Sequence, residues 1–276
     1  GKVTSKKIDD ILFEAEQLVS NGYKEIVLTG IHLGAYGKET GYQLNIINVL
    51  EELQALPGLE RIRLSSIEVN EVTDDLIDLI ADSDRVCPHF HLPLQSGDDY
   101  ILKRMNRKYD AAQYLETVER IRGRLELPSI STDILVGFPG EKRIHFENTM
   151  KLCEQAGFSR AHIFSYSPRE DTPAAKMPDH CKPSDIKERK KELESLTAET
   201  SLEYKNLFVG RDIGILVEKE RDKKTGKLCG YSDRYIKALF DGPDDLMNEI
   251  ADVHVESVSP QSVMGKCCSH AERGNK

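Results

Sequence analysis

The sequence lacks several features that would assign it to a special class of protein. It contains no tryptophan, no pair of cysteines spaced as CxxC, and no apolar run near the roughly 18 residues that cross a bilayer. We expect no secretory leader, because no such pattern precedes the first helical segment. The cysteines, which fit no disulfide framework, are Cys87, Cys153, Cys181, Cys229, Cys267 and Cys268. We therefore expect a cytoplasmic protein with reduced thiols and no membrane contact.

The sequence is also short of positive charge. It has 38 Lys and Arg residues against 47 Asp and Glu residues, for a net charge of −9. As a whole, such a chain repels a polyanion, which argues against non-specific binding to nucleic acid. A local basic cluster remains possible and is the relevant footprint. The length of 276 residues is typical of one large domain with a smaller one.

Helical and strand-like patterns alternate over the first two thirds of the chain. Apolar residues recur at helical spacing in several segments, the first at residues 7–20. Strand-like runs lie between these segments, at residues 25–29, 61–65, 89–92, 129–136 and 161–164. This alternation predicts βαβ units and a parallel sheet, either a barrel or a doubly wound sheet. In both folds, ligands bind at the carboxyl ends of the strands.

The pattern changes after the fifth strand-like run. Residues 166–183 contain four prolines and predict irregular structure, and Ser184 is a suitable N-cap for a long charged helix. Beyond Gly210, apolar residues alternate at period two, which predicts a small antiparallel β-barrel. We expect an α/β domain at 1–183, a connecting helix at 184–205, a small barrel at 206–268 and a tail at 269–276.

The five predicted strand ends are polar or rich in glycine and proline. They read "LTGIHLGAYG", "RLSSIE", "HLPLQSG", "DILVGFPGE" and "IFSYSPREDTP". Hydroxyl and amide side chains with exposed glycine backbone are what a polar cofactor requires, so we favour a shared ligand site. Ordinary loop composition remains the alternative, since most loops after strands are polar.

Two groups of basic residues are candidate phosphate contacts. A basic face on one helix would contain Lys103, Arg104, Arg107 and Lys108. A basic and aromatic barrel surface, typical of a platform for single-stranded nucleic acid, would contain Lys219, Arg221, Lys223, Lys224, Lys227, Arg234, Tyr235 and Lys237. The acidic residues among the second group leave an ordinary solvated surface as the alternative.

His89 and His91 lie two residues apart on a predicted strand, so both side chains point to one face. Such a pair could bind zinc in a metal-dependent barrel hydrolase. The sequence shows no obvious third and fourth ligand, and we favour packed or hydrogen-bonded histidines.

Taken together, these motifs resemble those of the radical S-adenosylmethionine methylthiotransferases. "HLPLQSG", "DILVGFPGE" and "YSPREDTPAA" occur in the family's order, and residues 206–268, with "GYSDRYIKALF", resemble its RNA-binding TRAM barrel. "GIHLGAYG" and "RLSSIE" are most similar to the branch that acts on N6-threonylcarbamoyladenosine in tRNA. The resemblance implies a partial parallel TIM-like barrel followed by the TRAM barrel. It also implies methylthiolation of carbon 2 of an adenine next to the anticodon.

The resemblance further implies two ligands, S-adenosylmethionine and tRNA. The tRNA would contact the two basic groups. The cofactor would lie against Thr29, Gly30, Ser65, Ser66, Glu68, Gln95, Ser96, Gly97, Asp133 and Gly137. It assigns no catalytic side chain and no oligomeric state.

One departure from the family is large. The family binds its catalytic [4Fe-4S] cluster through a CxxxCxxC loop, and this sequence contains no such loop. We therefore expect no metal site in this chain and no activity from the chain alone. Two interpretations stay open besides the hydrolase. The chain is part of an enzyme whose cluster ligands lie elsewhere, or it is an RNA-binding protein that has lost its cluster.

Overall fold

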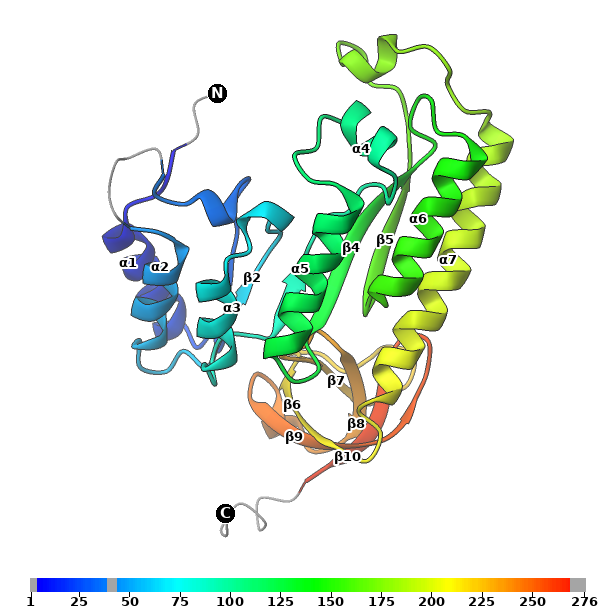
Figure 1. The fold of residues 1–276 in the computed structure, drawn as a ribbon. Coiled ribbons are helices and arrows are strands. Elements are labelled where there is room, and N and C mark those ends of the chain that lie inside the picture. The colour runs from blue at the N-terminus through cyan, green and yellow to red at the C-terminus, as the bar shows by residue number, and fades with distance from the viewer. Residues whose placement is uncertain (1–3, 39–43, 269–276) are drawn as a thin grey trace.

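The computed structural model describes residues 4–38 and 44–268, which form two units (Figure 1). Five strands build the first unit: β1 (Glu25–Leu28), β2 (Arg61–Leu64), β3 (His89–His91), β4 (Ser129–Val136) and β5 (Arg160–Ser165). Every pairing among them is parallel, and bridges from Ile62 to Val86 and from Ser66 to His91 connect β2 to the β3 side. The predicted partial parallel barrel is confirmed.

Seven helices in the described residues accompany these strands and cover their outer side (Figure 1). They are α1 (Ile8–Ser20), α2 (Ile46–Gln54), α3 (Asp74–Ala81), α4 (Asp99–Arg104), α5 (Ala111–Arg124), α6 (Arg143–Ala156) and α7 (Pro183–Asn206). Side-chain oxygens of Asn45, Thr73, Asp98 and Asp110 cap four of the helix starts. None of these helices is both long and apolar enough to cross a membrane.

Helix α7 connects the two units. It packs along β5 and α6 through Leu193 and Thr197, and its last turns reach the second unit through Tyr204. The helix begins at Pro183, with Lys182 as the N-cap residue, so the expected Ser184 cap is wrong. Proline fits this first helical position because its missing N–H would have no partner there.

The second unit is a closed five-stranded barrel, as predicted. Its strands are β6 (Asp212–Val217), β7 (Leu228–Ser232), β8 (Lys237–Asp241), β9 (Ile250–Val258) and β10 (Val263–Cys267), in the order β10-β8-β7-β6-β9. One seam departs from the predicted antiparallel pattern, because β10 and β8 pair in parallel. Directions cannot alternate around a ring with an odd number of strands, so one pair must be parallel. The predicted tail at 269–276 lies outside the described residues.

Two arginines of β2 attach the sheet to the small barrel. Arg63 is 2% exposed and donates to both carboxylate oxygens of Glu25, at 2.7 and 3.0 Å. The same guanidinium donates to the carbonyls of Ser232 and Asp233 at 3.0 and 2.6 Å. Arg61 donates to the carbonyls of two further barrel residues. The barrel therefore lies against the amino ends of the strands.

We predict that Arg63→Met lowers the free energy of unfolding by about 3–5 kcal/mol, because it leaves the Glu25 carboxylate buried and unpaired. The matched control is Arg120→Met. Arg120 pairs with the half-exposed Asp74 at 2.6 Å, and exposed pairs contribute about 0–1 kcal/mol. Urea unfolding of both variants would measure the difference. Equal losses of stability would contradict the assigned role of Arg63.

Candidate functional site

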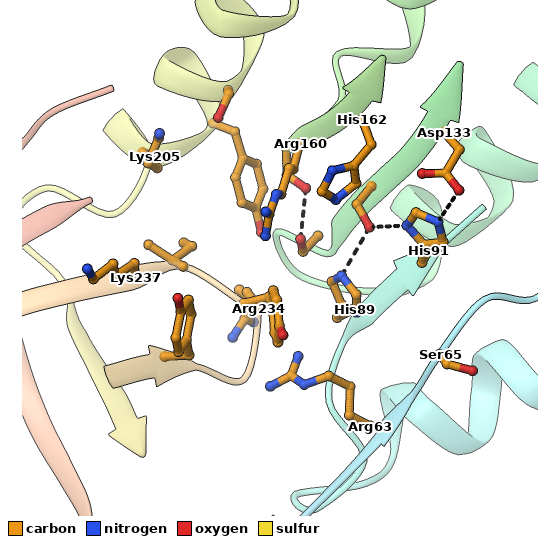
Figure 2. Close-up of a pocket in the computed structure, with 18 of the residues that line it drawn as sticks. Arg63, Ser65, His89, His91, Asp133, Arg160, His162, Lys205, Arg234 and Lys237 are labelled. Atoms are coloured by element: carbon orange, nitrogen blue, oxygen red, sulfur yellow. Dashed lines mark hydrogen bonds and ion pairs between the residues drawn. The ribbon is translucent and has the colours of Figure 1, made fainter. Parts of the chain in front are cut away.

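A cavity of about 720 Å³ lies between the inner face of the parallel strands and the small barrel (Figure 2). Strands β1 to β5 line one side, and residues 231 and 234–237 of the small barrel line the other. The end of α7 contributes Ser201, Tyr204 and Lys205. The cavity is therefore built jointly by both units. Its volume is within the roughly 300–1,000 Å³ of small-molecule sites.

The strands present polar side chains to this cavity in successive layers. His91, Ser131 and Arg160 are at one level, because β3, β4 and β5 pair in that register. Asp133 pairs with His162 at the next level, about 6.6 Å closer to the carboxyl ends. A parallel sheet is normally apolar on both faces. A polar inner face therefore indicates contact with a ligand or solvent.

A hydrogen-bonded group links three of these side chains. His91 Nε2 is 3.3 Å from Asp133 Oδ2, and its Nδ1 is 3.0 Å from Ser131 Oγ. Burial opposes ionisation of Asp133, yet the hydrogen bond from His91 and the nearby His162 together lower the pKa of this carboxyl. Asp133 therefore carries a negative charge and suits a cationic group of a ligand.

His89 is a neutral, buried imidazole at the base of the cavity. It is 7% exposed, and its Nε2 lies 3.2 Å from Ser131 Oγ. Burial, with the charges of Arg63, His91 and Arg160, lowers the pKa of His89 to about 3. Its Nδ1 is buried without a hydrogen-bond partner. Buried polar atoms are rarely left unpaired, so this nitrogen is a candidate ligand contact.

The metal-dependent hydrolase finds no support in this geometry. Both His89 and His91 direct a ring nitrogen to the hydroxyl of Ser131. Within residues 4–38 and 44–268, no group of three or more His, Cys, Asp or Glu side chains could hold a metal ion.

The cysteines do not fit an iron–sulfur cluster. Iron binds the thiolate form and needs several cysteines together. Burial raises the pKa of Cys87 to about 12 and also raises that of Cys153. These two thiols lie in different elements, one before β3 and one in α6. The cysteines of the described residues therefore do not form a cluster site.

The residues predicted to bind the cofactor fall in three places. Ser65, Ser66 and Asp133 line the main cavity. Thr29 and Gly30 line a second cavity, of about 600 Å³, between α1, β1 and α2. Val27 contributes to both cavities, so the two adjoin along β1.

The remaining predicted cofactor residues make structural contacts outside the main cavity's lining. Gly97 donates its N–H to Thr149 Oγ1, and a Cβ at this position would lie 2.7 Å from the Thr149 backbone. Ser96 is buried beside the same threonine. The backbone of Gln95 bonds to residues 133 and 135 of β4. The N–H of Gly137 binds Glu141, and Glu68 accepts from Arg107.

The first basic group does not form one helical face, so this prediction is wrong. Helix α4 ends at Arg104, because Asn106 has a left-handed backbone with φ of 59°. Arg104 donates to the carbonyl of Pro139, Arg107 pairs with Glu68, and Lys108 donates to Asn106. Lys103 lies in α4. Alone of the four, it makes no side-chain hydrogen bond or ion pair among the described residues.

The second basic group divides into outward and inward residues. Acidic neighbours pair with several of its members: Arg221 with Asp244, Lys223 with Glu220, Lys227 with Asp241, and Lys237 with Asp222. The Lys219 ammonium lies 5.3 Å from the ring centre of Tyr23. Lys224 is exposed on the same hairpin. Arg234, Tyr235 and Lys237 line the main cavity.

Sequence reasoning missed several residues that line the cavity. They are Arg63, Arg160, Tyr204, Lys205 and Tyr231. One signal was available for the strand residues. Polar and apolar residues alternate in "SISTDILV" and "RAHIF", which buried parallel strands do not ordinarily show.

We predict that His89→Gln weakens the pH dependence of stability. The unfolded imidazole takes up a proton below its ordinary pKa of about 6.5, whereas the folded one stays neutral down to about pH 3. Folding therefore loses stability as the pH falls through this window. From pH 7 to 5 the loss due to His89 is about 2 kcal/mol.

Urea unfolding at pH 7 and pH 5 would measure this loss. The matched control is His180→Gln, which removes an exposed imidazole outside the cavity. If His89→Gln lost as much stability between the two pH values as the unsubstituted protein, the buried neutral state of His89 would be disproved.

This chain is similar in sequence to several known proteins. The profile described as the radical SAM superfamily matches residues 1–153. Threonylcarbamoyladenosine tRNA methylthiotransferases from Thermotoga maritima and Bacillus subtilis are 39% and 35% identical over 95% and 92% of this chain, and over 59% and 57% of their own lengths. A tRNA-2-methylthio-N(6)-dimethylallyladenosine synthase from Alkaliphilus oremlandii is 35% identical over 96% of this chain and 56% of its own.

The chain thus spans somewhat more than half the length of these curated relatives. Among solved structures, coproporphyrinogen III oxidase from Escherichia coli, described as a radical SAM enzyme, is similar with a TM-score of 0.53 and 15% identity. That match covers 72% of this chain and 48% of the other. It shows likeness of fold alone. The resemblance to methylthiotransferases is confirmed by the sequence relatives, and the chain belongs to the radical SAM superfamily.

Proposed function

We propose that this chain forms the S-adenosylmethionine-binding and RNA-binding part of a tRNA methylthiotransferase. The proposed substrate is N6-threonylcarbamoyladenosine next to the anticodon, modified at carbon 2. The observation that carries the proposal is the cavity shared by the sheet and the small barrel. An RNA held by the barrel would face the inner side of the strands. The names and identities of the relatives from Thermotoga maritima and Bacillus subtilis support this branch.

The residues present fit part of the proposed cofactor. S-adenosylmethionine carries a sulfonium, an ammonium and a carboxylate, and when bound beside a reduced cluster it supplies radical and methyl-transfer chemistry. Asp133, the one carboxylate in the cavity lining, would attract its positive groups. His91 would hold that carboxylate in position from the adjacent strand. Ser65 and Ser66 offer hydroxyl groups at the end of β2. Closure by the small barrel would keep water from the inner face.

A second candidate function is RNA binding without catalysis. It needs only the cavity and the basic, aromatic surface of the small barrel. The two proposals agree on RNA and differ on chemistry. Cluster content and product formation therefore separate them.

We predict that the chain prefers an anticodon stem-loop bearing N6-threonylcarbamoyladenosine. Its affinity should be about tenfold higher than for the same stem-loop with plain adenosine, a difference of about 1.4 kcal/mol. Both affinities should fall as salt rises, since phosphate contacts release counterions. Fluorescence anisotropy at two salt concentrations would measure this. Equal affinities would reject the proposed substrate, and no binding to either stem-loop would reject an RNA function.

We also predict that the chain alone forms no four-iron cluster and no product. Anaerobic reconstitution with iron and sulfide, followed by an iron count, tests the first part. Incubation with S-adenosylmethionine, dithionite and tRNA, followed by mass spectrometry of the nucleosides, tests the second. About four irons per chain, or a methylthiolated nucleoside, would show that these cysteines suffice.

A further inference from the structure

The cavity between the sheet and the small barrel has an excess of positive charge. Although the whole chain has a net charge of −9, the lining contains a single carboxylate, Asp133. Its lining also contains five basic side chains, from Arg63, Arg160, Lys205, Arg234 and Lys237. A concentration of this sign in an acidic protein favours an anionic ligand.

Partners outside the lining neutralise three of these five cations. Glu25 pairs with Arg63, Asp233 with Arg234, and Asp222 with Lys237. The lone carboxylate, Asp133, is engaged by His91. Two cations are thus left without a carboxylate in the part of the chain that the structure describes.

Arg160 and Lys205 are these two cations. Arg160 is exposed and has no ion pair or side-chain hydrogen bond among the described residues. Figure 2 shows its side chain extending from β5 into the space between the sheet and Arg234. Lys205 is 7% exposed, and its ammonium donates to the carbonyl of Pro260. Arg160 in particular presents an unused guanidinium, whose planar donors match a phosphate.

Aromatic rings form the opposite wall. Tyr231 and Tyr235 stack with ring centres 5.1 Å apart, and His89 lies 5.4 Å beyond Tyr235. Tyr235 holds a left-handed backbone with φ of 61°, which is rare for a bulky residue. Such strain is concentrated at functional positions. Aromatic faces of this kind stack on nucleic-acid bases without regard to sequence.

His89 provides a second, independent observation. This side chain is more than nine-tenths buried, lines the cavity and keeps Nδ1 without a hydrogen-bond partner. The cavity therefore combines an unused guanidinium, stacked rings and an unsatisfied imidazole nitrogen.

We propose that this cavity binds a nucleoside monophosphate unit. Its phosphate would lie at Arg160, and its base would lie against the Tyr231–Tyr235 stack. S-adenosylmethionine is a poorer match for Arg160 and Lys205, because its sulfonium and ammonium groups would meet their positive charge, whereas Asp133 is the group that would attract them. The unit could come from a free nucleotide or from a strand of RNA. The RNA source rests on the proposed function, whereas the free nucleotide does not.

The test is calorimetric titration of the whole chain with adenosine 5′-monophosphate and with adenosine. Arg160→Gln should reduce affinity for the monophosphate tenfold or more, because it removes a charge-assisted bond. Affinity for adenosine should stay the same. Tyr231→Leu should weaken the binding of both ligands alike. The matched control is Arg124→Gln on the outer surface of α5, which removes the same charge away from the cavity and should change neither affinity.

Competition with the anticodon stem-loop identifies the source. Displacement of the monophosphate by the stem-loop supports an RNA nucleotide as the ligand. Binding of both together supports a free nucleotide here and RNA contacts elsewhere. The inference is overturned if the monophosphate does not bind, or if Arg160→Gln binds it as tightly as the unsubstituted chain. Stem-loop binding that survives either failure leaves the proposed function standing.

Discussion

The buried guanidinium groups of Arg61 and Arg63 are the constraint on which the arrangement of this molecule depends. Removing a charge from water is expensive, and the cost is offset only where charge and hydrogen bonds are fully matched. Arg63 meets this condition through Glu25 on the neighbouring strand and two carbonyls of the small barrel. These bonds fix the orientation of the small barrel on the sheet as well as its attachment. They set residues 231–237 opposite the inner face of the sheet.

The character of the cavity follows from that placement. Helices bury the outer face of the strands, which is therefore apolar, while the inner face meets a barrel surface bearing tyrosines and basic residues. The two faces of one strand consequently differ in polarity. In β4, Ile130 and Ile134 pack under the helices, and Ser131 and Asp133 point to the cavity. Parallel sheets are normally apolar on both faces, so the polar inner face indicates that it contacts a ligand. The architecture is thus suited to holding a charged aromatic molecule between two units.

The sequence predicted the elements better than it predicted their use. Alternating apolar runs and helical periods predicted the parallel strands, and period-two spacing after Gly210 predicted the small barrel. Local departures from these patterns were harder to predict. Asn106 ends α4 through a backbone conformation that asparagine tolerates but does not require. The parallel seam between β8 and β10 follows from strand number, which becomes clear only when the ring closes.

The candidate site was harder still to predict, because the same residue type can serve packing or ligand binding. A glycine is needed wherever another group approaches the backbone closely, and at Gly97 that group is helix α6. A sequence cannot distinguish this from approach by a cofactor. Arg160 and Tyr231 are far apart in the chain, and the docking of the small barrel on the first unit brings them to one cavity. The interaction that organises the site is therefore tertiary, and no motif contains it.

The most direct measurement of this account is a crystal structure of the chain with a short adenine dinucleotide that carries a 5′-phosphate. The account predicts a phosphate within hydrogen-bond distance of the Arg160 guanidinium and a base against the Tyr231–Tyr235 stack. It also predicts that the bonds of Arg61 and Arg63 to the small barrel are unchanged. A dinucleotide bound only on the outer hairpin of residues 219–227, with the cavity holding none of it, would contradict the account.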